Sequence, residues 1–199
     1  MLHGGSIDSS MRVGRLSPAA LRLVPVARTV GRSVRNAAVY RLRFSIRGWN
    51  ADGAAVLRDA RWAVSEIARR HPGLPVVLVG HSLGGRVAMQ TVRTERAAVG
   101  AVGLAPWLVA DDAVDGLDGA PLFVVQGTRD RTIPEPSTRD WLARAVGAGA
   151  QVESVLIERG GHPMLRYARR WHRLAADGVL SVLADADLPA IPQPGMIPP

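Results

Sequence analysis

The segment Val76–Gly85, VVLVGHSLGG, constrains the fold of this chain more than any other. Its four leading apolar residues predict a short buried strand, as found at the centre of a parallel sheet. A helix is predicted over 84–93, so Ser82 falls in a sharp strand-to-helix turn. Such a turn strains the serine backbone, and side chains two residues to either side would collide, which explains Gly80 and Gly84. The pattern therefore predicts that Ser82 stands above the carboxyl edge of the sheet, where ligands bind in α/β folds.

Short apolar runs alternate with helical patterns along the chain, which favours an α/β fold with a mostly parallel sheet. Strands are predicted over 39–45, 76–79, 98–104, 122–126 and 152–157, and helices over 17–34, 52–71, 84–93, 136–146 and 164–184. The predicted helices carry three tryptophans that we expect in the core: Trp62, Trp141 and Trp171. We expect one domain over residues 1–187 and a Pro-rich, disordered tail over 188–199.

The Gly-His-Ser-Leu-Gly turn, with its strand before and helix after, resembles the nucleophile elbow of the α/β-hydrolases. That resemblance implies a three-layer α/β/α sandwich and a nucleophile, acid and base in the order Ser, Asp, His. Asp130, in a Gly-Thr-Arg-Asp loop after a predicted strand, matches the acid. His162, in a Gly-Gly-His turn before the last helix, matches the base. Asp111 and Asp112, which follow the preceding strand, stay open as alternative acids.

An oxyanion hole is expected from two backbone N–H groups. Leu83 lies at a helix N-terminus, where its N–H can donate to a developing oxyanion. The segment Leu2–Ser6, LHGGS, resembles the family's His-Gly loop and offers Gly5 as the second donor, with Ser6 as the alternative. His3 is expected to shape that loop.

The resemblance implies a serine hydrolase that cleaves a small-molecule ester or thioester through an acyl-enzyme on Ser82, with no metal or organic cofactor. We expect Trp49, Trp107 and His81 to line the substrate site. Two alternatives stay open. One is an oligopeptidase-like or dienelactone-type hydrolase, and the other is a catalytically inactive binding protein on the same scaffold.

The chain departs from the family at its start. Only Met1 and Leu2 precede the His-Gly loop, where family members have a complete strand, so we expect a fold that lacks the family's first strands and a chain that starts late. Only 17 residues separate the strands that end at Leu104 and begin at Leu122. That is too few for a helical cap, so we expect an open site.

The net charge is +8, and all 25 basic residues are arginines. Nine of them lie between Arg12 and Arg47, where no acidic residue occurs. A G+C-rich coding bias explains this composition, and an anionic partner is the alternative. No nucleic-acid motif, apolar stretch of roughly 18 residues or signal peptide is present, so we expect a bacterial, cytoplasmic protein without nucleic-acid or membrane partners. The absence of cysteine excludes disulfides and thiolate chemistry. Nothing in the sequence indicates an oligomeric state.

Overall fold

The computed structural model describes residues 1–186, so the tail predicted over 188–199 lies outside the described residues. The helices are α1 (Pro18–Ser33), α2 (Ala54–Arg70), α3 (Leu83–Val92), α4 (Glu135–Gly147) and α5 (Ala168–Asp185). The strands are β1 (Val76–His81), β2 (Ala98–Leu104), β3 (Pro121–Gly127) and β4 (Gln151–Ile157). Among these residues, no helix combines the length and the hydropathy needed to cross a bilayer.

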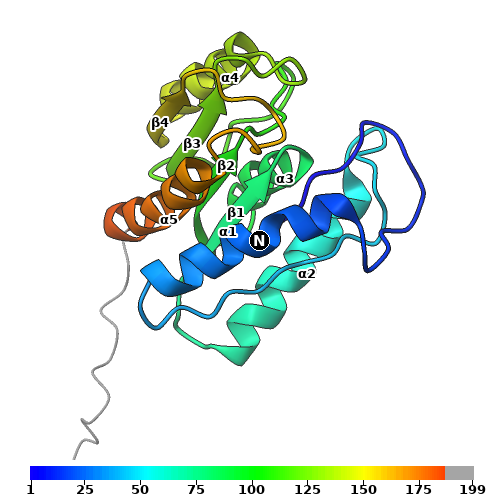
Figure 1. Ribbon diagram of the computed structural model, residues 1–199. Coiled ribbons are helices and arrows are strands. Elements are labelled where there is room, and N and C mark those ends of the chain that lie inside the picture. The colour runs from blue at the N-terminus through cyan, green and yellow to red at the C-terminus, as the bar shows by residue number, and fades with distance from the viewer. Residues whose placement is uncertain (187–199) are drawn as a thin grey trace, which may run out of the picture.

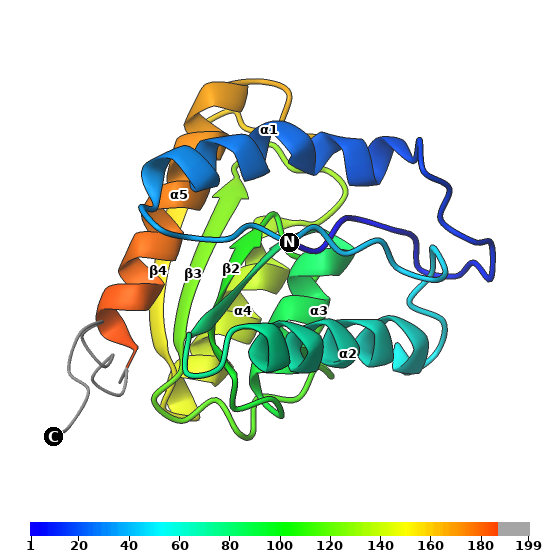
Figure 2. The same ribbon diagram turned by 90° about the horizontal axis from the view of Figure 1, so that it is seen from below.

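The four strands form one parallel sheet in the order β1-β2-β3-β4. Helices α1 and α5 pack side by side on one face, and α2, α3 and α4 cover the other (Figures 1 and 2). Each face buries its own apolar cluster. The expected three-layer α/β/α sandwich is confirmed. Within the described residues no helix lies between β2 and β3, as expected of a fold without a cap.

The first residues of the chain lie beside β1. The Leu2 N–H donates to Val79 O at 2.8 Å, and the His81 N–H donates to Leu2 O at 3.1 Å. On its other side this segment accepts the Leu42 N–H at Met1 O, at 3.0 Å. The strand predicted over 39–45 is therefore wrong, because only Leu42 forms an isolated bridge there. A strand needs a run of paired residues, and the neighbouring segment pairs at Leu2 alone.

Two further expectations need correction. The last helix begins at Ala168 and not at Met164, because Met164 and Tyr167 have φ angles of 57° and 59°, which an α-helix excludes. Trp62 is 63% exposed, because the face of α2 that packs inward carries Val56, Ala60 and Val64. Trp141 and Trp171 are fully buried, as predicted.

Candidate active site

Ser82 lies at the turn between β1 and α3 with φ 54° and ψ −119°, a conformation that is rare for a side-chain-bearing residue. The two glycines leave room for this turn. A Cβ on Gly80 would overlap the carbonyl of Gly84, and a Cβ on Gly84 would overlap the carbonyl of Leu2. The Ser82 N–H donates to Leu104 O at 3.1 Å, and its carbonyl accepts the Trp107 N–H at 3.0 Å. The elbow is therefore held against the end of β2.

The loops after β3 and β4 bring Asp130 and His162 to Ser82. The two nitrogens of His162 face different partners: Nε2 lies 2.9 Å from Ser82 Oγ, and Nδ1 lies 2.8 Å from Asp130 Oδ2. An ionised carboxylate can only accept, so Nδ1 carries the hydrogen and Nε2 is free to accept from the Ser82 hydroxyl. Because the carboxyl ends of parallel strands share one edge, residues 80 positions apart in the chain meet there.

The Asp130 carboxylate is buried and accepts several hydrogen bonds besides that from His162. Its Oδ1 accepts the N–H groups of Thr132 and Ile133, at 2.9 and 2.8 Å. Burial alone would raise the pKa of Asp130, but the hydrogen bonds from His162 and from these two N–H groups lower it below its usual value. Asp130 is therefore held as an anion that fixes the orientation of the His162 ring.

The Gly4–Gly5 segment lies against the nucleophile turn. A Cβ on Gly4 would lie 3.5 Å from Ser82 Cβ, and a Cβ on Gly5 would overlap the Leu83 side chain. The N–H groups of Gly5 and Leu83 donate to no other group within residues 1–186. The alternative donor, Ser6, is already engaged, since its N–H donates to Arg47 O at 2.9 Å.

His3 braces the same loop. Its Nδ1 lies 2.7 Å from Gly4 O, and its Nε2 accepts the Phe44 N–H at 3.1 Å. A ring that donates from Nδ1 and accepts at Nε2 is neutral, and burial lowers the pKa of His3, which keeps it neutral. His3 thus ties the Gly4–Gly5 segment to the chain at Phe44.

The residues expected to line the substrate site have other neighbours. His81 is buried and contacts the backbone of His162. Trp49 and Trp107 enclose the Arg86 guanidinium, whose central carbon lies 3.8 and 4.5 Å from their ring centroids. These two tryptophans therefore pack on a charged group, and their part in lining the substrate site stays a prediction.

The alternative acids do not reach His162. Asp111 is exposed. Asp112 is buried and its Oδ1 accepts from Arg86 Nε and Nη2, at 2.9 and 2.6 Å. Of the three candidate acids, the structure brings only Asp130 to His162.

Two residues that lie around the site were not predicted from the sequence, Gln126 and Arg86. Gln126 Nε2 donates to Ile133 O at 2.8 Å and lies 3.3 Å from Asp130 Oδ2, so it braces the acid loop. Its signal is a polar residue near the end of an otherwise apolar strand. Arg86 carried no such signal, because only the structure shows that every residue of its helix is buried.

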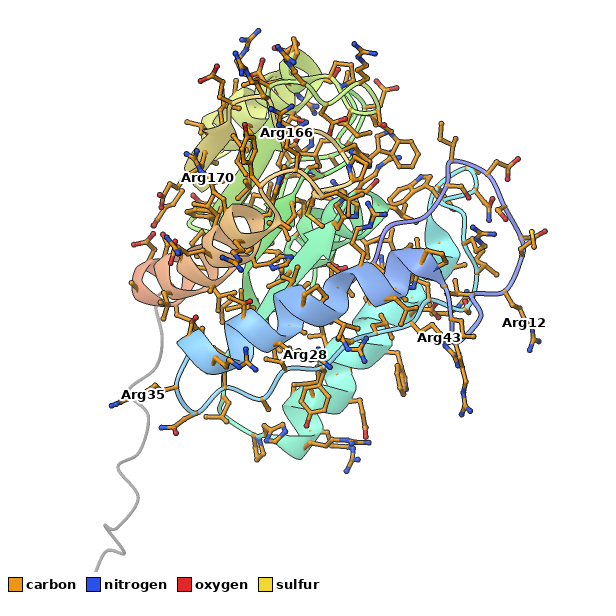
Figure 3. All side chains as sticks on the ribbon, viewed as in Figure 1. Arg12, Arg28, Arg35, Arg43, Arg166 and Arg170 are labelled. Carbon is orange, nitrogen blue, oxygen red and sulfur yellow. The ribbon has the colours of Figure 1, made fainter. Side chains whose placement is uncertain are left out.

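The arginines of the N-terminal quarter form a second feature of the surface. Figure 3 shows Arg12, Arg28, Arg35 and Arg43 projecting outward from α1 and the segments around it. None of the nine arginines from Arg12 to Arg47 forms an ion pair with a described acid, whereas seven arginines between 61 and 159 do. This surface carries charge but no group suited to bond cleavage. Within residues 1–186, no cluster of three metal-ligating side chains is found.

The sequence matches the protein family described as "Serine aminopeptidase, S33" over residues 31–119. That range includes Ser82 but neither Asp130 nor His162. No curated protein matches the chain.

Solved structures resemble most of the chain. Est1E from Butyrivibrio proteoclasticus, solved with ferulic acid, is 15% identical with a TM-score of 0.61, covering 92% of this chain and 88% of its own. The Bacillus cereus carboxylesterase is 19% identical with a TM-score of 0.55, covering 87% and 89%. The sugar hydrolase YeeB from Lactococcus lactis is 16% identical with a TM-score of 0.65, covering 92% and 91%. At these identities the likeness establishes the fold.

Proposed function

Because this chain has an α/β-hydrolase fold, we propose that it is a serine hydrolase that cleaves a small-molecule carboxylic ester or thioester through an acyl-enzyme on Ser82. One observation carries the proposal: His162 bridges Ser82 Oγ and Asp130 Oδ2 at 2.9 and 2.8 Å, with Ser82 in a strained elbow. A nucleophile, a base and an orienting acid in this contact are the requirements for nucleophilic acyl transfer.

In the proposed mechanism, each step is carried by one residue. Ser82 Oγ attacks the acyl carbon while its proton passes to His162 Nε2. The N–H groups of Gly5 and Leu83 hold the negative oxygen of the tetrahedral intermediate. His162 then protonates the departing alcohol or thiol, which leaves the acyl group on Ser82. Water, deprotonated by His162, attacks this acyl-enzyme, and the proton then passes from His162 to Ser82 Oγ as the acid is released. Asp130 stabilises the imidazolium in both halves of the reaction.

A fluorophosphonate probe tests the nucleophile directly, because it reacts with an activated serine and spares ordinary hydroxyls. Intact-mass analysis should show a single adduct on the wild type and none on Ser82→Ala. Ser154→Ala is the matched control, since this exposed β4 serine lies outside the site and should leave labelling unchanged. A folded wild-type protein without an adduct would exclude the proposal and favour a binding protein on a hydrolase scaffold.

A peptidase is the second candidate, favoured by the description of the family that matches residues 31–119. A p-nitrophenyl ester and an alanine p-nitroanilide separate the two. We expect turnover of the ester and at most slow turnover of the anilide. A higher kcat/KM on the anilide would replace the esterase proposal with the peptidase.

A further inference from the structure

His81 precedes Ser82 in the chain, yet its side chain serves a different residue. Its ring is buried, with 4% of the residue exposed. Its Nε2 lies 3.0 Å from the backbone carbonyl oxygen of His162, and the two rings pack with their centroids 5.0 Å apart. The residue beside the nucleophile thus contacts the residue proposed as the base.

The partners of His81 fix its tautomer. A carbonyl oxygen can only accept, so Nε2 must carry the hydrogen and donate it. Nδ1 is buried and has no hydrogen-bond partner within residues 1–186. Nδ1 faces the Gly4–Gly5 segment, and a Cβ on Gly4 would lie 3.2 Å from it. A proton on Nδ1 would therefore be buried without an acceptor. Burial accordingly lowers the pKa of His81 to about 4, with the charge of Arg22 acting in the same direction.

The loop that carries His162 needs such an anchor. Gly160 and Gly161 precede His162, and a Gly-Gly pair allows the backbone many conformations. The Arg129 N–H holds Gly160 O at 2.9 Å before His162, and Arg22 Nη1 holds Pro163 O at 2.6 Å after it. The carbonyl of His162 itself is held by His81. The ring of His162 also bonds to Asp130 and to Ser82, so His162 is held at its backbone by His81 and at both ring nitrogens.

We propose that His81 is a positioning residue, whose Nε2–H holds the backbone of His162 so that the imidazole stays in register with Ser82. The proposal rests on the proposed hydrolase function for its catalytic effect. Because His81 is 4% exposed and packs against His162, it offers little surface to a substrate, so its loss should lower kcat and leave KM nearly unchanged. A displacement of about 1 Å between reacting groups can cost about 10²-fold in rate.

Three substitutions separate the hydrogen bond from the space that the ring fills. Gln places an amide N–H near the position of the imidazole Nε2. Asn has the same chemistry but is one methylene too short to reach it. Leu fills space without a donor. We expect His81→Leu and His81→Asn to lose about 10- to 100-fold in kcat on a p-nitrophenyl ester, with KM within about twofold. We expect His81→Gln to recover most of that loss. Equal kcat in all four proteins, or a loss that falls on KM, would overturn the proposal.

Hydrogen exchange provides a readout that does not depend on catalysis. The Met164 N–H donates to Gly161 O at 3.1 Å, so its exchange reports on the order of the histidine loop. Exchange there should speed up in His81→Leu and His81→Asn but not in His81→Gln. If the wild type reacts with the fluorophosphonate but the variants match it in kcat and exchange, positioning by His81 is wrong and the hydrolase function stands. If the wild type does not react, the hydrolase function fails, and unchanged exchange in the variants would also exclude the anchor.

Discussion

Two buried carboxylates follow successive strands of the sheet, and each pairs with a basic side chain. Asp112, after β2, binds Arg86 at 2.6 Å, and Asp130, after β3, binds His162 at 2.8 Å. Both carboxylates also accept backbone N–H groups from their own loops, Asp112 from Val109 and Asp130 from Thr132 and Ile133. By distance and burial alone, the two pairs are closely similar.

The basic partner makes the difference. A guanidinium stays protonated at any relevant pH, and Arg86 is enclosed between Trp49 and Trp107, so its pair can hold charge but cannot move a proton. A neutral imidazole has one nitrogen that can accept a proton, and in His162 that nitrogen lies 2.9 Å from the Ser82 hydroxyl. The comparison teaches that a buried ion pair can relay a proton only where its basic partner can accept one and lies beside a group that can donate it.

Removing the Asp130 charge should have the largest effect on rate. Asn at position 130 can still accept the N–H groups of Thr132 and Ile133, so the loop should keep its shape. It cannot stabilise the imidazolium, and it favours the wrong tautomer of His162. We expect Asp130→Asn to lower kcat by about 10⁴-fold, the cost of the same change in a serine protease. Ester hydrolysis under saturating substrate measures this. A loss below tenfold would mean that the His162–Asp130 pair, like Arg86–Asp112, contributes to structure and not to the rate.

The Arg86–Asp112 pair should govern stability. Asp112→Ala leaves the Arg86 guanidinium buried without its partner, which typically costs about 3–5 kcal/mol of unfolding free energy. Urea unfolding gives this value, and titration of active sites with the fluorophosphonate corrects kcat for the folded fraction. Corrected in this way, kcat should stay within about threefold of the wild type. Besides the ion pair, the substitution removes, among the described residues, only the hydrogen bond that the Val109 N–H donates to Asp112 in the loop after β2.

A double substitution is the matched control for that experiment. Arg86→Met with Asp112→Leu removes both charges, and replacing a whole buried pair by apolar side chains is often neutral in stability. The double variant should therefore be more stable than Asp112→Ala alone. If Asp112→Ala unfolds like the wild type but loses kcat, the pair acts in catalysis and the contrast with Asp130 fails.

How far the sequence predicted this site depends on which signal each residue carried. Ser82 carried a local one, since glycines at fixed spacing around a strand-to-helix turn have a steric reason. Asp130 and His162 were predicted from their order along the chain in a resembling family, and the structure places His162 against Ser82 and Asp130 against His162. Arg86 and its pairing with Asp112 could not be predicted. Local periodicity does not show which loop will cover a given face of a helix, and here the partner lies 26 residues away.

The N-terminal segments were the hardest part of the fold to predict. The alternation at 39–45 has the period of a strand, but a strand also requires a neighbour that pairs over several residues, and pairing is set by the tertiary fold. Only Leu42 finds such a partner. The helix predicted from Met164 failed for a related reason, because the positive φ angles at Met164 and Tyr167 belong to the loop that delivers His162. The errors lie where long-range contacts override local pattern.

The smallest expected effect is the pH dependence of stability that Asp130 contributes. Its pKa in the folded protein is lowered below that of the unfolded chain, which is about 3.9 for an aspartate. This contribution is therefore fully present above about pH 4 and is lost as the pH falls through the folded-state pKa. The difference in unfolding free energy between wild type and Asp130→Asn should narrow on acidification from pH 5 to pH 3, as urea unfolding can measure.

Added salt distinguishes the contribution of Asp130 to stability from that of a carboxylate on the surface. Glu66 on α2 is hydrogen-bonded by Arg69 and Arg70, and these bonds lower its pKa to about 2. In Glu66→Gln the difference in unfolding free energy from the wild type should therefore also narrow as the pH falls from about 4.3 toward about 2. Because that network faces solvent, about 1 M salt should reduce its effect strongly. The Asp130 side chain is fully buried against His162, so its effect should persist in salt. If salt abolishes the pH dependence of both variants equally, the His162–Asp130 contact is open to water. The hydrogen bonds to Asp130 would then stabilise its ionised form less than we infer.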